Sequence, residues 1–312
     1  MTVQNQDIDH RSALSRFLDS DLVHAFAHSP RAVVSALVFA IILIAAVGAP
    51  LLAPHNPFLP PDLMNGLMPP AWTPGGSWEF PLGTDDQGRD VLSLIMYGTR
   101  MSLLVGFAAV ILAIAIGLFL GLLAGYVSGW IESVVMRFAD IQLSFPAILV
   151  ALLISGVVSA TFERDTQNLL ALPVLVFSIG LSDWVQYART ARGSTLVERN
   201  REYVKAARIM HVAAPTILFR HILPNILGPI IVIATLGLAS AIIAEATLSF
   251  LGVGMPPTQP SLGTLIRTGN DYLFSGEWWM TVFPALALVL LALSVNVFGD
   301  WLREALNPRI AK

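Results

Sequence analysis

The stretch Glu202–Asn225, EYVKAARIMHVAAPTILFRHILPN, is a long, largely polar interval between two apolar segments. Ala, Lys and Arg favour helix, so its first half predicts a short exposed helix with two adjacent alanines, Ala206 and Ala207. Small side chains let another protein approach closely, and the neighbouring Lys205 and Arg208 can pair with acidic groups on that partner. The alternative is a basic loop that only orients the protein in a membrane.

The composition indicates a membrane protein. Of the 312 residues, 55% are hydrophobic and only 12% are charged, and the mean hydropathy is +0.70, whereas a soluble domain has roughly 25% charged residues. The net charge of −3 gives no indication of nucleic-acid binding, and the absence of cysteine excludes disulfides and thiolate chemistry. The first apolar run begins late and is long, so no cleavable signal peptide is expected.

Apolar segments of the length needed to cross a bilayer, roughly 20 residues, follow one another along the chain. Five are free of charge. The remaining one is shorter because Asp183 interrupts it, although Trp184 and Tyr187 just beyond are suited to a membrane interface. The predicted spans are Ala32–Ala53, Met101–Tyr126, Ile141–Ala160, Asn168–Ser182, Ile222–Ala244 and Trp278–Gly299. The sequence thus predicts an all-α membrane protein with six transmembrane helices.

The distribution of basic residues predicts the orientation of these spans. An even number of spans places both termini on the same side of the membrane. With both termini in the cytoplasm, only Arg89, Arg100, Arg164 and Arg267 of the 18 Lys and Arg residues lie outside. Because basic residues concentrate on the cytoplasmic side of membrane proteins, the N- and C-termini are both predicted to be cytoplasmic.

The segments between the spans complete the predicted organisation. Apolar residues at helical spacing near the N-terminus predict an amphipathic helix on the membrane surface, with a frayed tail as the alternative. The outer loop is rich in Pro, Gly and Trp, which predicts irregular structure. The predicted segments are 1–30 (cytoplasmic), 31–53 (first helix), 54–98 (outer, periplasmic loop), 99–303 (a domain of five helices with a cytoplasmic loop at 190–221) and 304–312 (cytoplasmic tail).

Three separated motifs resemble one family of transport proteins. The run PLGTDDQGRDVLSLIMYGTRMSL, which begins at Pro81, resembles a signature of ABC importer permeases of the dipeptide/oligopeptide (peptide/nickel) branch, with Leu94 in place of an arginine. YVKAAR…RHILPN in the opening stretch resembles their EAA loop, and LSFLGVG at Leu248–Gly254 follows in the same order. The resemblance covers residues 80–300.

This resemblance implies both a fold and a function. Permeases of the family have the type I ABC importer fold and lie in the bacterial inner membrane. They assemble with a second permease subunit, two ABC ATPase subunits and an extracytoplasmic peptide-binding protein, and they translocate dipeptides or short oligopeptides. ATP and Mg²⁺ bind to the ATPase subunits, so this chain is expected to hold no cofactor and no catalytic residue. The same architecture importing glutathione or nickel is the alternative.

The resemblance also implies which residues dock onto an ATPase subunit. Lys205 stands where the family has glutamate, and His211 stands where it has glycine, so His211 is expected to adopt a positive φ. Ala207 is expected to be the anchor at which the ATPase and the permease come closest. The predicted docking residues of this coupling loop are Glu202, Tyr203, Lys205, Ala206, Ala207, Arg208, His211, Leu223 and Pro224.

Glycines and prolines within the spans predict close packing and bends. Three glycines spaced four apart lie on one face of the second span, where small residues let helices approach closely in lipid; this seam either slides during transport or packs statically. They are Gly117, Gly121 and Gly125. Pro146 is expected to kink the third span and Pro229 the fifth. Pro215 can begin a second helix in the opening stretch, because the N–H that it lacks would be unpaired there anyway.

Glu245 is the one carboxylate within a long apolar run, and an ionisable residue in a span is a candidate functional residue. It is expected either to form an ion pair with Arg267 or Arg100, or to contact a passing substrate in the translocation path. The acidic run at 85–90 lacks the spacing of a calcium-binding loop, so no metal site is predicted.

Sequence motifs of other function classes are missing. The chain has no G-x-x-x-x-G-K-[ST], so it has no P-loop of its own for ATP, and neither H-E-x-x-H nor G-x-S-x-G occurs. A polytopic membrane enzyme would need polar residues clustered within the spans, and a secondary transporter often shows internal repeats. Neither pattern is evident, so a pore subunit rather than an enzyme is expected.

Overall fold

The computed structural model describes residues 26–60 and 62–305. In that part of the chain the regular structure is helical, apart from one isolated bridge between Thr84 and Asp90. Most of the predicted N-terminal amphipathic helix and most of the predicted tail at 304–312 lie outside the described residues.

The first two predicted spans are present, with shifted ends. α3 (Pro30–Val47) is followed by Gly48 and by one further turn, α4 (Ala49–Leu52). α5 (Val91–Val127) has 37 residues and begins well before the predicted Met101. Asp90 explains this early start, because its carboxylate accepts a hydrogen bond of 2.9 Å from the backbone N–H of Ser93 and so caps the helix.

The third predicted span is broken rather than kinked. α6 (Trp130–Leu143) and α7 (Ala147–Thr161) meet at 88° across the proline at position 146. Proline lacks an N–H and disfavours helical backbone in the residue before it, so the break falls where the sequence predicted a bend.

The shortest predicted span, Asn168–Ser182, lies in the first half of a much longer helix. α8 (Arg164–Glu198) has 35 residues and continues through Asp183 without a break. Trp184 and Tyr187, expected at a membrane interface, are buried in the helix packing instead. Among the described residues, five helices are long and apolar enough to cross a membrane, or up to six if the bent pair α6–α7 forms one span.

The opening stretch contains one short helix and the beginning of a long one. α9 (Glu202–Ile209) is the predicted short helix. Pro215 lies in the first turn of α10 (Ala214–Thr216), as predicted, but no turn separates α10 from the next span. The chain continues through η2, a π-helical segment (Ile217–Ile222), into α11 (Leu223–Phe250). Pro224 cannot donate a hydrogen bond to the preceding turn, which favours a local departure from α-helical bonding.

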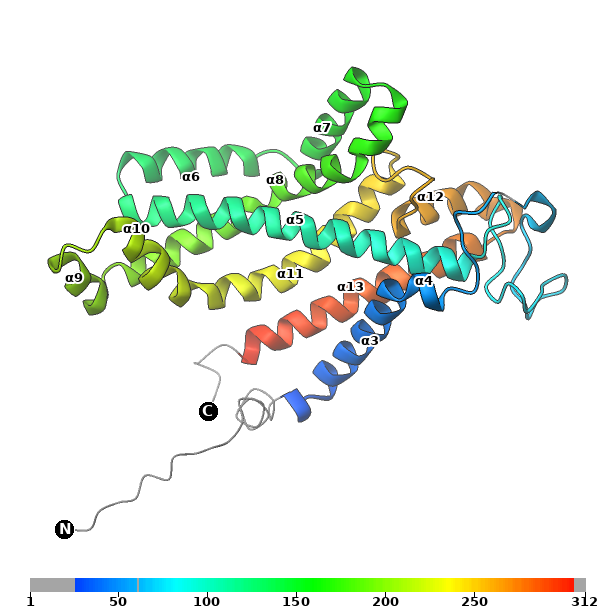
Figure 1. Ribbon diagram of the computed structural model, residues 1–312, viewed down its shortest axis with the longest axis horizontal. Coiled ribbons are helices and arrows are strands. Elements are labelled where there is room, and N and C mark those ends of the chain that lie inside the picture. Colours follow the sequence, from blue (N-terminus) through cyan, green and yellow to red (C-terminus); the bar gives the residue numbers. More distant parts are fainter. Residues whose placement is uncertain (1–25, 61, 306–312) are drawn as a thin grey trace, which may run out of the picture.

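Figure 1 shows the long helices side by side along the long axis of the molecule, with α13 (Trp279–Ala305) beside α3. α9 and α10 lie at one end. The irregular outer loop lies at the other end, with α12 (Leu262–Tyr272) and η3 (Leu273–Ser275) near it. α3 begins and α13 ends on the side that faces α9.

The predicted glycine seam joins α5 to α8. A methyl group on Gly117 would lie 2.4 Å from the carbonyl oxygen of Trp184, and one on Gly121 would lie 2.4 Å from that of Ala188. At Gly125 the nearest atom would be Cβ of Thr195, at 2.7 Å. These glycines therefore allow the two backbones to touch, whereas sliding of the seam stays a prediction.

The outer loop is irregular, as predicted, but side chains fasten it to the helices. Arg89 forms an ion pair of 2.7 Å with Asp85, within the acidic run. Nε1 of Trp279 donates a 3.1 Å hydrogen bond to the carbonyl of Thr84, which holds the loop against α13. The described residues contain no group of three side chains arranged to hold a metal ion.

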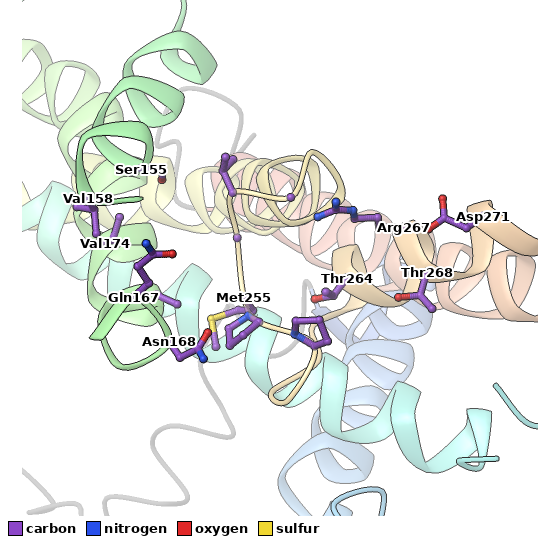
Figure 2. A pocket seen from close by; sticks show the side chains of 16 residues that line it. Ser155, Val158, Gln167, Asn168, Val174, Met255, Thr264, Arg267, Thr268 and Asp271 are labelled. Carbon is purple, nitrogen blue, oxygen red and sulfur yellow. The ribbon is translucent and has the colours of Figure 1, made fainter. Parts of the chain in front are cut away.

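A cavity of about 420 Å³ opens beside this end of the bundle (Figure 2). One wall comes from α7 and the first turns of α8. The opposite wall comes from α12, and the loop at 252–257, which follows α11, completes the lining. Segments about a hundred residues apart in sequence thus enclose one space.

Candidate functional site

α9 ends in a hydrogen-bonded turn built around His211. The φ of His211 is 56°, the positive value that the sequence predicted. Its N–H donates to the carbonyl of Arg208, and the N–H of Val212 donates to the carbonyl of Ala207, both at 3.0 Å. This pair of bonds is a Schellman motif, in which a residue in the left-handed region closes a helix. Histidine therefore takes the place that glycine usually has at such a position.

α9 has one face turned into the protein. Val204 and Ala207 are only 0% and 2% exposed, and they belong to the same hydrophobic core as Ile217 and Ile222 of η2. Ala207 thus packs inside its own chain, which contradicts the expectation that it is the anchor for a partner. Ala206 is on the exposed face.

The other face of α9 presents large apolar side chains next to basic ones. Ile209 and Met210 are 77% and 70% exposed, and Phe219 of η2 is also exposed. The guanidinium of Arg208 lies 5.0 Å from the centroid of the Tyr126 ring, so a cation–π contact links α9 to the end of α5. An apolar group beside basic side chains on an exposed helix is a surface suited to protein binding.

Tyr203 ties α9 to two long helices. Its hydroxyl donates to Oε2 of Glu198 at 2.7 Å, at the end of α8, and accepts from Nδ2 of Asn225 at 3.1 Å, at the start of α11. Burial, reinforced by the hydrogen bond to Glu198, raises the pKa of Tyr203, so the hydroxyl keeps its proton and can donate. Glu198 and Asn225 are absent from the predicted docking set, although Asn225 directly follows the Leu-Pro pair that marked the motif.

We refer to Tyr126, Glu198, Tyr203, Ala207 and Asn225 as the coupling cluster. Through these residues and Arg208, α9 contacts the ends of α5 and α8 and the start of α11. The predicted loop at 190–221 therefore includes the last turns of α8 and the first turns of the helix that becomes α11.

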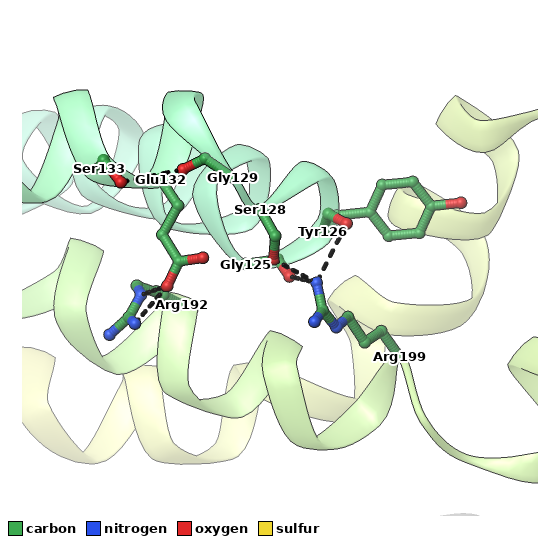
Figure 3. A network of polar contacts seen from close by, with 8 residues as sticks. All are labelled: Gly125, Tyr126, Ser128, Gly129, Glu132, Ser133, Arg192 and Arg199. Carbon is green, nitrogen blue, oxygen red and sulfur yellow. Dashed lines mark hydrogen bonds and ion pairs between the residues drawn. The ribbon is translucent and has the colours of Figure 1, made fainter.

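A polar network fixes the neighbouring turn between α5 and α6 (Figure 3). Arg199 donates to the carbonyl of Gly125 at 2.9 Å and to the hydroxyl of Ser128. Its charge lies at the C-terminus of α5, where the helix dipole favours a cation. Nε of Arg192, in α8, donates to Glu132 of α6 at 2.7 Å. These contacts link the end of α5 and the start of α6 to α8 beside the coupling cluster.

The remaining predicted docking residues lie around this cluster. Glu202 is in the first turn of α9, where a carboxylate favours the helix dipole. Lys205 is exposed, as a rim charge would be. Leu223 is half-buried and Pro224 is exposed, both at the start of α11.

Glu245 lies apart from the coupling cluster and is fully buried in α11. Its carboxylate accepts hydrogen bonds of 2.6 Å from the hydroxyls of Ser102 and Ser249. Within the described chain it forms no ion pair, so the expected pairing with Arg267 or Arg100 is wrong. Serine hydroxyls satisfy this buried carboxylate instead.

Comparison with known proteins agrees with this architecture. Residues 117–312 match the family described as the binding-protein-dependent transport system inner membrane component. Residues 20–70 match the N-terminal TM domain of oligopeptide transport permease C. The chain belongs to the dipeptide permease family of these binding-protein-dependent transport components, so it is a bacterial membrane protein with the type I permease fold, and it is a transport permease rather than an enzyme.

Three relatives illustrate the similarity. The dipeptide transport system permease protein DppC of Escherichia coli strain K12 is 42% identical over 290 residues, which is 92% of each chain. The di/tripeptide transport system permease protein DppC of Pseudomonas aeruginosa strain UCBPP-PA14 is 36% identical over 292 residues, 92% of this chain and 90% of the relative. The dipeptide transport system permease protein DppC of Haemophilus influenzae is 35% identical over 285 residues, 91% of this chain and 92% of the relative.

Proposed function

We propose that this chain is one of two permease subunits of an ATP-driven importer, and that it passes dipeptides and short oligopeptides inward from an extracytoplasmic binding protein. The family is dependent on a binding protein, and the three relatives above are named for the transport of dipeptides or tripeptides. ATP and Mg²⁺ bind to two partner ATPase subunits in this proposal, and the permease itself breaks no bond.

The structural observation that carries the proposal is the exposed face of α9 above the coupling cluster. Ile209 and Met210 offer apolar contact area, and the basic side chains beside them can pair with acidic groups on a partner. The partner that fits this surface and the family is an ATPase subunit. In this proposal the ATPase docks onto the exposed face of α9, which carries Ala206, and not onto the buried face, which carries Ala207.

The coupling cluster gives α9 a direct connection to the spans. A displacement of α9 by the ATPase acts on α8 and α11 through Tyr203 and on α5 through Arg208. Its buried face acts on η2, whose π-helical hydrogen bonds mark a place where a helix can readjust. Closure of the ATPases on ATP can thus switch the spans between inward and outward access.

A variant of the exposed face tests this proposal. In proteoliposomes that hold the complete complex and its binding protein, Ile209→Asp should leave the chain inserted, because the side chain is exposed. ATP-driven uptake of Ala-Ala should fall tenfold or more, and the ATPase should no longer copurify. The matched control is Lys205→Ala, since an exposed charge contributes only about 0–1 kcal/mol. Normal uptake and copurification in Ile209→Asp would show that α9 is not the docking element.

Competition between substrates tests the peptide assignment separately. Unlabelled dipeptides should suppress Ala-Ala uptake by the unmodified complex, whereas glutathione and Ni²⁺ should not. Suppression by glutathione or Ni²⁺ at lower concentration than by dipeptides would retain the permease assignment and replace the substrate.

A further inference from the structure

The cavity between α7–α8 and α12 has the features of a binding site, and it lies far from the coupling cluster (Figures 1 and 2). Amide side chains line one wall, and a cation and an anion line the opposite wall. Val158, Val174 and Met255 add apolar surface. The space of about 420 Å³ is large enough for a small molecule, and its lining is more polar than apolar, which suits a polar ligand.

Ser155 of α7 supplies an unsatisfied hydrogen-bonding group in this cavity. Its side chain is only 4% exposed, and its hydroxyl oxygen has no hydrogen-bond partner in the described chain. Buried polar groups are nearly always hydrogen-bonded, so a hydroxyl left unpaired beside a cavity indicates that the cavity takes an occupant with a polar group.

Arg267 and Asp271 supply two opposite charges that are free to bind a ligand. They lie one turn apart on α12, at a spacing that commonly gives an ion pair, yet they form no ion pair with each other. Neither side chain has a hydrogen bond or ion pair elsewhere in the described part of the chain. The Arg267 guanidinium lies over Gly252, where a methyl group would be 2.1 Å from its Nη1. This contact directs the cation toward the loop that lines the cavity.

We propose that this cavity holds a short peptide in transit by its two charged ends. Arg267 pairs with the terminal carboxylate, Asp271 pairs with the terminal ammonium group, and Ser155 bonds the peptide amide. Apolar lining residues accept varied side chains without selecting among them. The inference rests on the proposed import of peptides and adds to it the place where this chain contacts the substrate.

Two features of the ligand follow from this chemistry. A dipeptide with both termini free carries a carboxylate for Arg267 and an ammonium group for Asp271. N-acetyl-Ala-Ala-amide carries neither charge. Recognition of termini rather than side chains also suits a transporter whose substrates differ in sequence. A phosphoethanolamine headgroup of a lipid carries charges of the same two signs, so the test must separate it from a peptide.

Protection from chemical labelling tests occupancy directly. The chain has no cysteine, so Asn168→Cys introduces a single thiol at the cavity wall. In the complete complex, held in nanodiscs with its binding protein and a non-hydrolysable ATP analogue, Ala-Ala should slow maleimide labelling of this thiol severalfold. N-acetyl-Ala-Ala-amide should give no protection, and Arg267→Gln or Asp271→Asn should remove the protection by Ala-Ala.

The control thiol is Ser275→Cys, which is exposed and lies outside the cavity lining. Its labelling should not change with Ala-Ala. Labelling of Asn168→Cys that is equally slow with and without Ala-Ala would show a lipid headgroup or another fixed occupant, and it would overturn the proposal. Fast labelling that is insensitive to Ala-Ala would overturn it as well.

Uptake measurements separate this inference from the proposed function. Arg267→Gln and Asp271→Asn should each lower Ala-Ala uptake tenfold or more, while ATP hydrolysis stimulated by the binding protein is retained. Asn270→Ala, an exposed neighbour on α12 that does not line the cavity, should transport normally. If the unmodified complex transports no Ala-Ala, the proposed function fails. If the unmodified complex and both charge variants transport it equally, only this inference fails.

Discussion

His211 shows how a single residue can depart from a motif and keep its geometry. A left-handed conformation costs a residue with a side chain about 1–2 kcal/mol. Here the two hydrogen bonds of the Schellman motif close α9 and offset that cost. Histidine is also one of the residue types enriched in this region among non-glycine residues, so the sequence alone could predict the conformation.

His211→Gly should therefore be tolerated. Removing the side chain relieves strain but increases the entropy of the unfolded chain, an opposing effect of about 0.4–1 kcal/mol, so stability should change by less than about 1 kcal/mol. The measurement is Ala-Ala uptake together with thermal unfolding of the purified complex. His211→Val, a β-branched residue in the same conformation, should be clearly less stable. Complete loss of transport in His211→Gly would show that the imidazole makes a contact of its own.

Glu245 illustrates a site residue whose role only the tertiary structure reveals. Its hydroxyl partners are themselves acceptors: Ser102 accepts from the N–H of Leu262 at 3.2 Å, and Ser249 accepts from that of Met255 at 3.3 Å. The carboxylate thus connects α5 and α11 to the chain that leads into α12. Glu245 lies just beyond the predicted span Ile222–Ala244, and α11 continues through it to Phe250. No local sequence pattern could show that serines, rather than arginines, surround it.

Glu245→Ala should destabilise the fold, because each serine hydroxyl that loses its acceptor while buried costs about 1–3 kcal/mol. The expected result is a lower amount of folded protein in the membrane and a lower unfolding temperature. Glu245→Gln keeps an acceptor oxygen for one of the two serines and should lose less. Equal behaviour of the two variants would show that the hydrogen bonds to Ser102 and Ser249 do not stabilise this region.

Among the elements, α8 and the α6–α7 pair show that hydropathy locates a membrane helix but does not give its length or its bends. Counting apolar residues located each of the five candidate membrane helices, but it predicted α8 too short because Asp183 lies within it. The charge of Asp183 does not end α8, because a helix continues as long as its backbone hydrogen bonds form, even where one side chain is charged. Pro146 marks the position of the 88° break, but no local sequence pattern gives the angle between α6 and α7.

The seam between α5 and α8 leads to a prediction at this scale. Gly121→Ala should push the helices apart, because its methyl group would lie 2.4 Å from a backbone oxygen and 2.7 Å from Cβ of Ala191. Overpacking of this kind costs about 1–3 kcal/mol. Gly193→Ala, on α8 with no other atom within 4 Å of the added methyl group, is the matched control and should be neutral or slightly stabilising. Thermal unfolding of the purified complex distinguishes them, and equal stability would contradict close packing at the seam.

The two alanines of α9 should respond differently to the same change. Ala207→Glu places a charge in the hydrophobic core without a partner, and an uncompensated buried charge costs roughly 3–5 kcal/mol. This variant should therefore lower the amount of folded permease. Ala206→Glu is exposed and should fold normally, with an effect on stability within about 0.5 kcal/mol, while ATPase copurification falls. Normal folding of Ala207→Glu would contradict the inward orientation of that side chain.

For the whole molecule, the apolar segments predicted the fold class and the ordered motifs predicted the family, while the side-chain partners came from the tertiary structure. The alanine pair located the coupling segment, because its composition differs from that of a span. Sequence could not tell Ala206 from Ala207, since helical phase relative to η2 decides which one is buried. The cavity lined by Ser155 and Arg267 was likewise invisible, because it joins segments that no local pattern connects.

The orientation in the membrane is a property of the whole molecule, and the structure shows which exposed residues can report it by chemical labelling. The positive-inside rule places α9 in the cytoplasm and η3 outside, and the two lie at opposite ends of the bundle (Figure 1). Ser275 and Asn200 are both exposed, one at each end, whereas Thr195 is buried and would escape labelling on either side.

A membrane-impermeant maleimide should therefore label Ser275→Cys in sealed cells and should not label Asn200→Cys. After permeabilisation both thiols should react at similar rates, because both side chains are exposed to solvent. This second measurement separates lack of access from lack of reactivity. Labelling of Asn200→Cys in sealed cells, with Ser275→Cys protected until permeabilisation, would reverse the orientation and place α9 where no cytoplasmic ATPase could reach it.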